Sequence, residues 1–596
     1  MKKKWCVISV VGMMVLLACS SMQPADKAAR VIETYKQELK ELLEETHRFV
    51  QLAGNGTGKQ QLQQQFKKAR TAYKKIEWLA EYYYPYTAKS INGPALAEVE
   101  ADEKNKVVQP EGFQVIEQLL FTSGQAYNKE ELLQQTKVLH SNTGRLQNLI
   151  AVQETTDGHV FDALRLELFR IITLGITGFD SPVAGNSLNE AAAALKSVEH
   201  TLSFYRQTDK KTDALFKAAV QVLAAGEYNS VDRMKLITQY LNPVSAYITV
   251  VQQDLTIPFF AEPRPLRADA NTLFDKAVFN ADFYTPGVWA YSNPGKVALG
   301  RKLFYDGILS GNGRRSCATC HEPSKAFTDG LATSLAANEK TSIRRNAPTL
   351  INAALQPSLF YDTRVSYLED QAKDVISNKD EMHGSLDSAI KWINRNAVYR
   401  KLFGEVYASG PVSEMQIKNS IAAYVRSLVQ MDARFDRYMK GNHLAMNQTE
   451  VDGFNVFAGK AKCATCHFIP LFNGSNPPQF GKTDAEVIGV PATADSLHPV
   501  LDGDEGKYNV YKVDLHMHAF KTPTLRNVDA TAPYMHNGAF KTLEEVVEFY
   551  NRGGGAGLGL NVSNQTLAAD KLNLSAYEKR ALVSFMKTLT DTSSGR

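Results

Sequence analysis

The pentapeptide Cys-Ala-Thr-Cys-His occurs twice in this sequence, at residues 317–321 and again at residues 463–467. Two cysteines three positions apart can form thioether bonds to the porphyrin of a c-type haem, and the histidine that follows can bind the iron. A disulfide, a zinc site or a thioredoxin-like pair would also use the two cysteines. None of these needs a histidine directly after the second cysteine in both copies. The repeat therefore predicts two covalently bound haem c groups, attached through Cys317, Cys320, Cys463 and Cys466, with His321 and His467 as iron ligands.

The length and charge of the chain limit the other possibilities. Its 596 residues exceed what one hydrophobic core usually serves, which indicates two to four domains. The formal net charge is +4 and there is no long basic run, so nucleic acid is not expected as a partner. Besides the haem cysteines there are only Cys6 and Cys19, both near the N-terminus, so none remains for a structural disulfide.

The first 19 residues have the pattern of an export signal. Lys2, Lys3 and Lys4 precede an apolar stretch of 14 residues, 5–18, which is too short for a typical membrane span. The stretch ends in Leu-Leu-Ala-Cys at residues 16–19, which resembles a bacterial lipobox. The resemblance implies cleavage before Cys19 and lipidation of that residue, whereas plain secretion would leave Cys19 incidental. We expect a periplasm-facing lipoprotein of the bacterial cell envelope that meets the membrane only through this anchor.

The region from about residue 28 to 255 has the periodicity of a helical bundle. Apolar residues such as Val31, Tyr35 and Leu39 recur at helical spacing. Residues 112–117, Gly-Phe-Gln-Val-Ile-Glu, resemble the Gly-x-His-x-x-Glu signature of imelysin-like proteins, which are all-helical domains linked to bacterial iron uptake. Gln114 stands where that family has histidine, and an amide is a poor metal ligand. Glu117 is therefore expected to make a structural hydrogen bond, with metal binding as the alternative.

The segment from about residue 293 to 552 resembles the bacterial di-haem cytochrome c peroxidases, a family that includes the MauG-type enzymes. The resemblance is carried by both haem motifs and by the stretches around them, at residues 299–306, 327–330, 345–350, 520–528 and 531–538. It implies a mainly α fold in which the N-terminal helical bundle precedes two cytochrome-c-like α-helical haem domains. The expected divisions are 1–19 (lipoprotein signal peptide), 20–255 (imelysin-like helical domain), 256–271 (linker), 272–440 (first, peroxidatic haem) and 441–596 (second, electron-transfer haem).

The resemblance also implies a catalytic set over the first haem. A peroxidase needs an open iron position and an acid/base that moves a proton between the two peroxide oxygens. The family's pocket glutamine and glutamate, ten residues apart, match Gln371 and Glu381. Ten residues before the glutamine, the family has an aromatic residue between the haems. Here it is Tyr361, where the peroxidases usually have tryptophan, and oxidation of tyrosine is coupled to proton loss.

Many family members carry a histidine in the loop after the first haem, and it blocks the iron until the second haem is reduced. The corresponding loop here, residues 331–345, contains no histidine. We therefore hypothesise that the first haem is five-coordinate at rest. His383, two residues beyond Glu381, is an alternative ligand.

At the second haem, the family has an axial methionine fourteen residues after a histidine that matches His536. That position is Tyr550, and MauG-type enzymes also have tyrosine there. Thr542 and Glu545 form a capping box for a helix that turns Tyr550 towards the interior. We expect Tyr550 to bind the second iron. A core tyrosine is the main alternative, and the other possible ligands are Met535, Met517, His516 and His518.

Other ligand positions follow from the same resemblance. The family's calcium ion, held by an asparagine side chain and two backbone carbonyls, would lie at Asn346, Thr531 and Pro533, all of which supply the oxygen ligands that calcium prefers. Arg364 and Arg526 are expected to bind haem propionates, although either could form a surface salt bridge instead.

Three functions remain open at this point. The first is a peroxidase that reduces hydrogen peroxide to water with electrons from a small donor protein such as cytochrome c. The second is a MauG-like oxidase that acts on a protein or another large substrate. The third is a non-enzymatic lipoprotein for electron transfer or for haem and iron handling. An open iron facing Glu381 argues against the third, because a pure electron carrier needs no such site.

Overall fold

The computed structural model of the chain describes residues 27–99, 106–124, 126–206, 209–408 and 410–591. The expected signal peptide and Cys19 lie outside these residues. Within them the fold is mainly α, as predicted, and its strands form two short antiparallel pairs. These are β1 (Glu98–Val99) with β2 (Val107–Val108), and β3 (Ala485–Glu486) with β4 (Phe520–Lys521). In the part of the chain so described, no helix is both long and apolar enough to cross a membrane.

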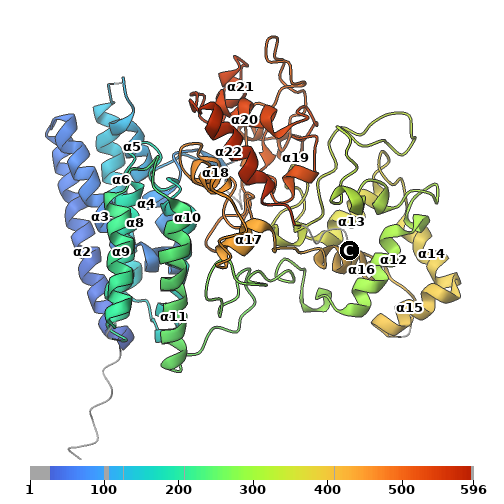
Figure 1. Cartoon of the computed structure of the whole chain (residues 1–596), viewed down its shortest axis with the longest axis horizontal. Coiled ribbons are helices and arrows are strands. Elements are labelled where there is room, and N and C mark those ends of the chain that lie inside the picture. The colour runs from blue at the N-terminus through green and yellow to red at the C-terminus, as the bar shows by residue number, and fades with distance from the viewer. Residues whose placement is uncertain (1–26, 100–105, 125, 207–208, 409, 592–596) are drawn as a thin grey trace, which may run out of the picture.

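The N-terminal region is the predicted helical bundle (Figure 1). Buried residues of its first helix, Val31, Tyr35, Leu39 and Leu42, follow each other at intervals of three or four, so one face packs against its neighbours. The helices are α2 (Lys27–Gly54), α3 (Lys59–Tyr83), α4 (Pro85–Asn92), α5 (Phe113–Phe121), α6 (Lys129–Ala151), α7 (Asp157–Arg170), α8 (Ser187–Ser203), α9 (Lys210–Ala225), α10 (Arg233–Leu236) and α11 (Asn242–Asp254). Two π-helical turns, 171–175 and 237–241, extend α7 and α10.

The rest of the chain forms two halves, each with one pentapeptide in a short 3-10 turn, at Cys317–Thr319 and Cys463–Thr465. The first half contains α12 (Pro294–Tyr305), α13 (Leu368–Ser377), α14 (Leu386–Arg395), α15 (Ala397–Tyr407) and α16 (Glu414–Arg426). Then follow α17 (Arg434–Met439), α18 (Gln448–Ala458), α19 (Tyr508–Tyr511), α20 (Leu543–Asn551), α21 (Gly554–Gly557) and α22 (Ala576–Lys587).

Each half uses the same packing device just before its pentapeptide. Gly300 on α12 lies against α16, where a Cβ atom would come within 1.8 Å of the Ser420 carbonyl oxygen. Gly453 on α18 lies against α22, where a Cβ atom would come within 2.0 Å of the Ala581 carbonyl oxygen. The two helix pairs therefore meet at backbone contact distance, which only glycine allows, and they fix where each motif begins.

The cores divide the molecule differently from the sequence. One continuous hydrophobic core joins the helical bundle to the second half, whereas the first half has two clusters of its own. Figure 1 shows the second half between the bundle and the first half, with α18 beside α10. The segment expected as a linker takes part in the shared core through the buried Leu266 and Ala270. The bundle and the second half are thus packed as one body.

Candidate functional site

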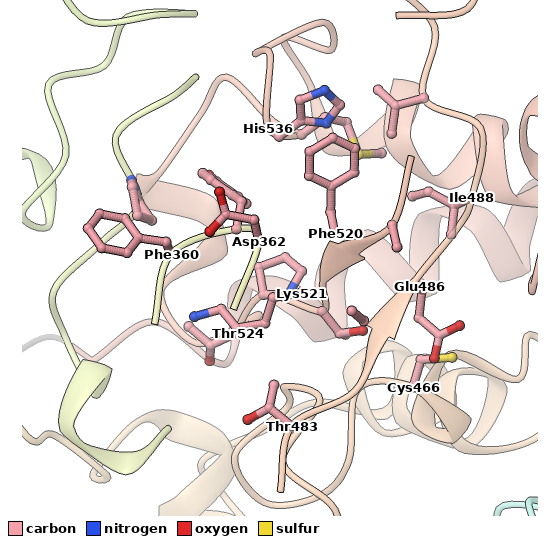
Figure 2. Close-up of a pocket in the computed structure, with 18 of the residues that line it drawn as sticks. Phe360, Asp362, Cys466, Thr483, Glu486, Ile488, Phe520, Lys521, Thr524 and His536 are labelled. Carbon is pink, nitrogen blue, oxygen red and sulfur yellow. The ribbon is translucent and has the colours of Figure 1, made fainter. Parts of the chain in front are cut away.

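A cavity of about 1640 Å³ is lined by both pentapeptides. Pockets for one small molecule usually measure roughly 300–1,000 Å³, so this one has room for more than one cofactor. Residues of both halves form its wall. Figure 2 shows part of it, where the ring of Phe520 stacks on that of His536 with centroids 3.7 Å apart. His536 Nε2 also lies 2.9 Å from Asp502 Oδ1.

The first motif presents its ligating groups to this cavity. His321 Nδ1 donates a hydrogen bond to the Phe327 carbonyl oxygen at 2.9 Å, which leaves Nε2 available for a metal. Burial lowers the pKa of His321, which favours the neutral imidazole that ligation requires. Cys317 and Cys320 are free thiols, and burial raises the pKa of Cys317 to about 12.

The second motif repeats this arrangement. His467 Nδ1 lies 3.1 Å from the Pro523 carbonyl oxygen and 3.3 Å from that of Phe472, and burial lowers its pKa to about 4. Cys463 and Cys466 are again free thiols. Each motif therefore brings two unpaired cysteines and one histidine with a fixed tautomer to the wall of one large cavity. These residues fit two covalently attached haem c groups.

Gln371 and Glu381 both line the cavity. Gln371 lies on α13, and Glu381 lies in the turn that follows this helix. Asn378 begins the turn, and its Nδ2 donates to Glu381 Oε1 at 2.7 Å. Asn378 Oδ1 accepts from the Asp380 N–H at 3.0 Å, which fixes the orientation of the amide. The sequence did not single out Asn378, although it lies three residues before Glu381.

The electrostatic surroundings of Glu381 suit an acid/base group. Burial raises the pKa of Glu381, and Asp374 adds to this effect. The positive charges of Arg364 and Arg315 and the hydrogen bond from Asn378 oppose it. The net effect is a pKa above the usual range of a glutamate. A pKa shifted towards the working pH makes a carboxyl group a better proton acceptor and donor.

Tyr361 lies where the two halves meet. Its carbonyl oxygen accepts from the Lys521 N–H at 2.7 Å, and its side chain lines the cavity. Burial raises the pKa of Tyr361, and the charge of Arg345 opposes this rise. Arg345 also joins the halves, because it binds Asp362 at 2.6 Å and Asp504 at 2.7 Å. Figure 2 shows Asp362 and Phe360, which flank Tyr361 in sequence, near Lys521.

Tyr550 lies on α20 and lines the cavity near the second motif. The helix has the predicted capping box between Thr542 and Glu545. Burial raises the pKa of Tyr550, with smaller contributions from Cys466, Cys463 and Glu486, so the phenol lies close to the thiols. Axial ligation by Tyr550 stays a prediction. Among the alternative ligands, His516 and Met535 line the cavity, whereas Met517 and His518 do not.

The three residues expected to bind calcium all line the same cavity. The backbone N–H of Asn346 donates to the His536 carbonyl oxygen at 2.7 Å, which ties its segment to the one that contains Thr531 and Pro533. The Asn346 Nδ2 donates to the Leu331 carbonyl oxygen at 2.7 Å, which leaves its side-chain oxygen for another partner.

The two arginines expected at the propionates differ. Arg364 lines the cavity, although it also binds Asp362 at 2.9 Å and Asp374 at 2.8 Å. Arg526 does not line it. The Arg526 guanidinium is buried against Asp436, at 2.8 and 2.9 Å, and donates to the Pro470 carbonyl oxygen. Arg526 therefore has a structural partner in place of the haem carboxylate expected from the sequence.

Other residues differ from expectation in their position. His383 is exposed and does not line the cavity, so nothing in its placement favours iron ligation. Arg315, two residues before the first motif, is buried in the cavity wall and was not singled out by the sequence. The feature of the sequence that could have identified Arg315 was its position two residues before the haem cysteine Cys317.

The helical bundle contributes to the wall beside the second motif. Phe179 and Tyr228 both line the cavity, and the Phe179 ring lies 5.6 Å from that of Phe468, the residue after the motif histidine. The Tyr228 hydroxyl donates to the Thr177 carbonyl oxygen at 2.6 Å. Lys462 Nζ, directly before the motif, donates to the Pro182 carbonyl oxygen at 3.2 Å. The bundle is therefore part of the second haem's surroundings.

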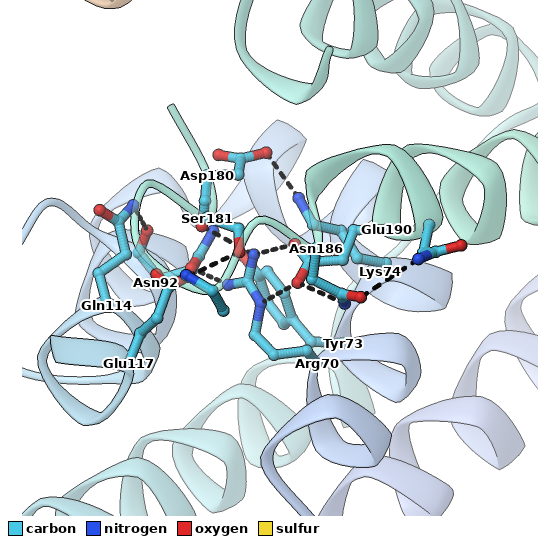
Figure 3. A network of polar contacts seen from close by, with 12 residues as sticks. Arg70, Tyr73, Lys74, Asn92, Gln114, Glu117, Asp180, Ser181, Asn186 and Glu190 are labelled. Atoms are coloured by element: carbon cyan, nitrogen blue, oxygen red, sulfur yellow. Dashed lines mark hydrogen bonds and ion pairs between the residues drawn. The ribbon is translucent and has the colours of Figure 1, made fainter. Parts of the chain in front are cut away.

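Glu117 has the structural role that the sequence favoured. It accepts hydrogen bonds from the Ser181 hydroxyl and from the Ala184 N–H, both at 2.7 Å. Figure 3 shows it beside a buried network in which Arg70 binds Glu190. No group of three or more His, Cys, Asp or Glu side chains in the described part of the chain is arranged to hold a metal ion. The imelysin-like resemblance stays a prediction.

Comparisons with known proteins agree with this site. The family described as di-haem cytochrome c peroxidase matches residues 294–444. Cytochrome-c peroxidase IdrP2 of Denitromonas iodatirespirans is 34% identical over 313 residues, which cover 50% of this chain and 82% of that protein. The methylamine utilization protein MauG of Methylophilus methylotrophus is 33% identical over 302 residues, which cover 49% of this chain and 82% of that protein.

Among solved structures, a MauG-like protein associated with microbial copper homeostasis matches 52% of this chain and 94% of its own at 29% sequence identity, with a TM-score of 0.47. The sequence relatives, more than 30% identical over about four fifths of their own length, decide the assignment. The chain belongs to the di-haem cytochrome c peroxidase family, whose members are oxidoreductases with two haem c groups.

Proposed function

We propose that the protein is a peroxidase of the cytochrome-c peroxidase type, which reduces hydrogen peroxide to water with two electrons from a small redox protein such as cytochrome c. The observation that carries this proposal is Glu381, a half-buried carboxyl group on the cavity wall beside the first motif, held by Asn378. The bound haems would supply the iron at which the O–O bond is cleaved and the path for electrons.

The residues account for the proton movements of this reaction. Hydrogen peroxide, two electrons and two protons give two molecules of water. The Glu381 carboxylate accepts the proton from the peroxide oxygen nearer the iron and returns it to the far oxygen, which leaves as water. Gln371 contributes a neutral amide that can hydrogen-bond the peroxide without competing for the proton. The raised pKa of Glu381 makes its carboxylate a stronger base, which helps it accept the proton before returning it.

Tyr361 is proposed as the electron relay between the two halves, because it lines the cavity at their junction. Its oxidation requires loss of the phenol proton. The positive charge of Arg345 favours that loss, because it lowers the pKa of the phenol. The relay is therefore expected to be slower at low pH than an indole relay would be.

The proposal is tested by peroxide turnover with reduced cytochrome c. In Glu381→Gln the proton acceptor is lost while the side chain keeps its size, so turnover should fall by about 10²- to 10⁴-fold. Asp387→Asn, which alters an exposed carboxylate at the start of α14, serves as the matched control and should retain turnover. Equal turnover in wild type and Glu381→Gln contradicts the proposal.

A second candidate is an oxidase of the MauG type, and Tyr550 is the observation that favours it. A phenolate bound to the second iron would stabilise the ferric state, which suits storage of oxidising equivalents for a protein or another large substrate. This function predicts that the wild type reacts with peroxide but does not turn over with reduced cytochrome c. Sustained turnover with cytochrome c rejects it.

We also propose a calcium ion at Asn346, Thr531 and Pro533, supported by their shared place on the cavity wall. Because the protein supplies three ligands, water would complete the shell. Metal analysis of the purified protein before and after treatment with a chelator tests this, and absence of bound calcium in the untreated protein rejects it.

The proposed location is the periplasmic face of the bacterial cell envelope, with a lipid anchor at Cys19. It is supported by the charged and apolar residues that precede Cys19. Cys19→Ser should release the protein from the membrane fraction. An unchanged membrane fraction in this variant rejects the anchor.

A further inference from the structure

Arg315 is a buried cation that forms no salt bridge within 4 Å among the described residues. The residue is 6% exposed. One terminal nitrogen, Nη2, donates to the Leu335 carbonyl oxygen at 2.6 Å and lies 3.7 Å from Cys320 Sγ. The other, Nη1, is buried and has no hydrogen-bond partner. A buried, unpaired charge is strongly unfavourable, so this position calls for an anion.

The surroundings of Arg315 indicate which anion fits. A haem c attached at Cys320 would carry its carboxylates at the porphyrin edge opposite the thioether bonds, whereas Arg315 is held beside Cys320. Leu335 belongs to the loop 331–345, which contains no histidine that could occupy the iron. The charge of Arg315 also acts on Glu381, so the guanidinium and the carboxyl group belong to the same part of the cavity.

We propose that Arg315 Nη1 binds the anionic ligand at the open face of the first haem: hydroperoxide during turnover, and a small anion such as fluoride in the resting protein. This inference rests on the proposed function. When hydrogen peroxide binds, its O–H bond breaks, the proton moves to the Glu381 carboxylate, and the resulting hydroperoxide oxygen accepts a hydrogen bond from Arg315. No electron moves in this step. A planar guanidinium suits it, because one terminal nitrogen stays on Leu335 while the other reaches the anion.

The test is a fluoride titration of the resting ferric protein, followed by the absorption spectrum of the haem. Arg315→Gln removes the charge, so the dissociation constant for fluoride should rise at least tenfold, or about 1.4 kcal/mol. Arg314→Gln removes an equal charge from the exposed neighbouring residue and should change the constant by less than twofold. An unchanged affinity in Arg315→Gln overturns the proposal.

A second variant keeps the proposal testable if Arg315→Gln does not incorporate haem. Arg315→Lys keeps the charge, but a single ammonium group cannot serve both the Leu335 carbonyl and the anion in the same geometry. Its fluoride affinity should fall at least threefold, and a wild-type affinity again overturns the proposal.

If Glu381→Gln abolishes turnover while fluoride affinity is insensitive to Arg315, only this inference fails. If fluoride affinity depends on Arg315 but Glu381→Gln retains turnover, the peroxidase function fails instead.

Discussion

The reactivity of Glu381 depends on residues that hold it. Asn378 is the direct contact, with a hydrogen bond of 2.7 Å to the carboxylate. Asn378→Asp would place a second negative charge there and raise the pKa of Glu381 further. Because peroxide must meet an ionised Glu381, its reaction slows as the pH falls through that pKa. The acid limb of the rate should therefore move to higher pH, as measured by stopped-flow mixing with peroxide across pH. An acid limb at the wild-type pH would show that Asn378 does not control Glu381.

At this scale, covalent chemistry was predictable and side-chain partners were not. The haem cysteines and histidines could be found because attachment needs fixed types at fixed spacing. Gln371 and Glu381 followed from family resemblance, and both line the cavity. The sequence suggested a haem propionate as the partner of Arg526, whereas its guanidinium binds Asp436. This pair could not be predicted because Asp436 lies ninety residues away in sequence and no local pattern signals it.

At the scale of single elements, local signals located α20 well. The capping box of Thr542 and Glu545 starts it, and Gly553, with φ +89°, follows its last residues in the left-handed conformation. This helix carries Tyr550 to the second motif. If Tyr550 binds the second iron, Tyr550→Met should raise the reduction potential of that haem, since thioether ligation favours the ferrous state. Spectroelectrochemical titration measures it, with Tyr577→Phe, at an exposed position of α22, as control. An equal potential in Tyr550→Met rejects ligation.

The helix pairs beside the motifs give a stability prediction. Gly453→Ala would force a methyl group to within 2.0 Å of the Ala581 carbonyl oxygen, so α18 and α22 must separate. A loss of about 1–3 kcal/mol in the free energy of unfolding is expected. Gly404→Ala, on α15 with nothing within 4 Å of the added atom, should instead stabilise by about 0.4–1 kcal/mol. Chemical denaturation of both variants measures the difference, and equal effects would contradict the close approach.

At the scale of the whole molecule, the helical bundle and the second half share one hydrophobic core. Calorimetry should therefore show them unfolding in one transition, separate from the first half, whose clusters are its own. Separate transitions for the bundle and the second half would contradict a shared core.

The sequence predicted both the bundle and the haem halves. It could not show that Phe179 and Tyr228 reach the second haem's cavity, because such contacts join residues more than two hundred positions apart.

The central claim concerns the whole assembly, namely one iron with an open position that faces Glu381. Electron paramagnetic resonance of the resting, fully ferric protein tests it most directly. Because the loop 331–345 offers no histidine and His383 is exposed away from the cavity, the first haem should give a high-spin ferric signal. A spectrum in which both haems are low-spin would mean that a protein ligand closes the first iron, and it would contradict the account.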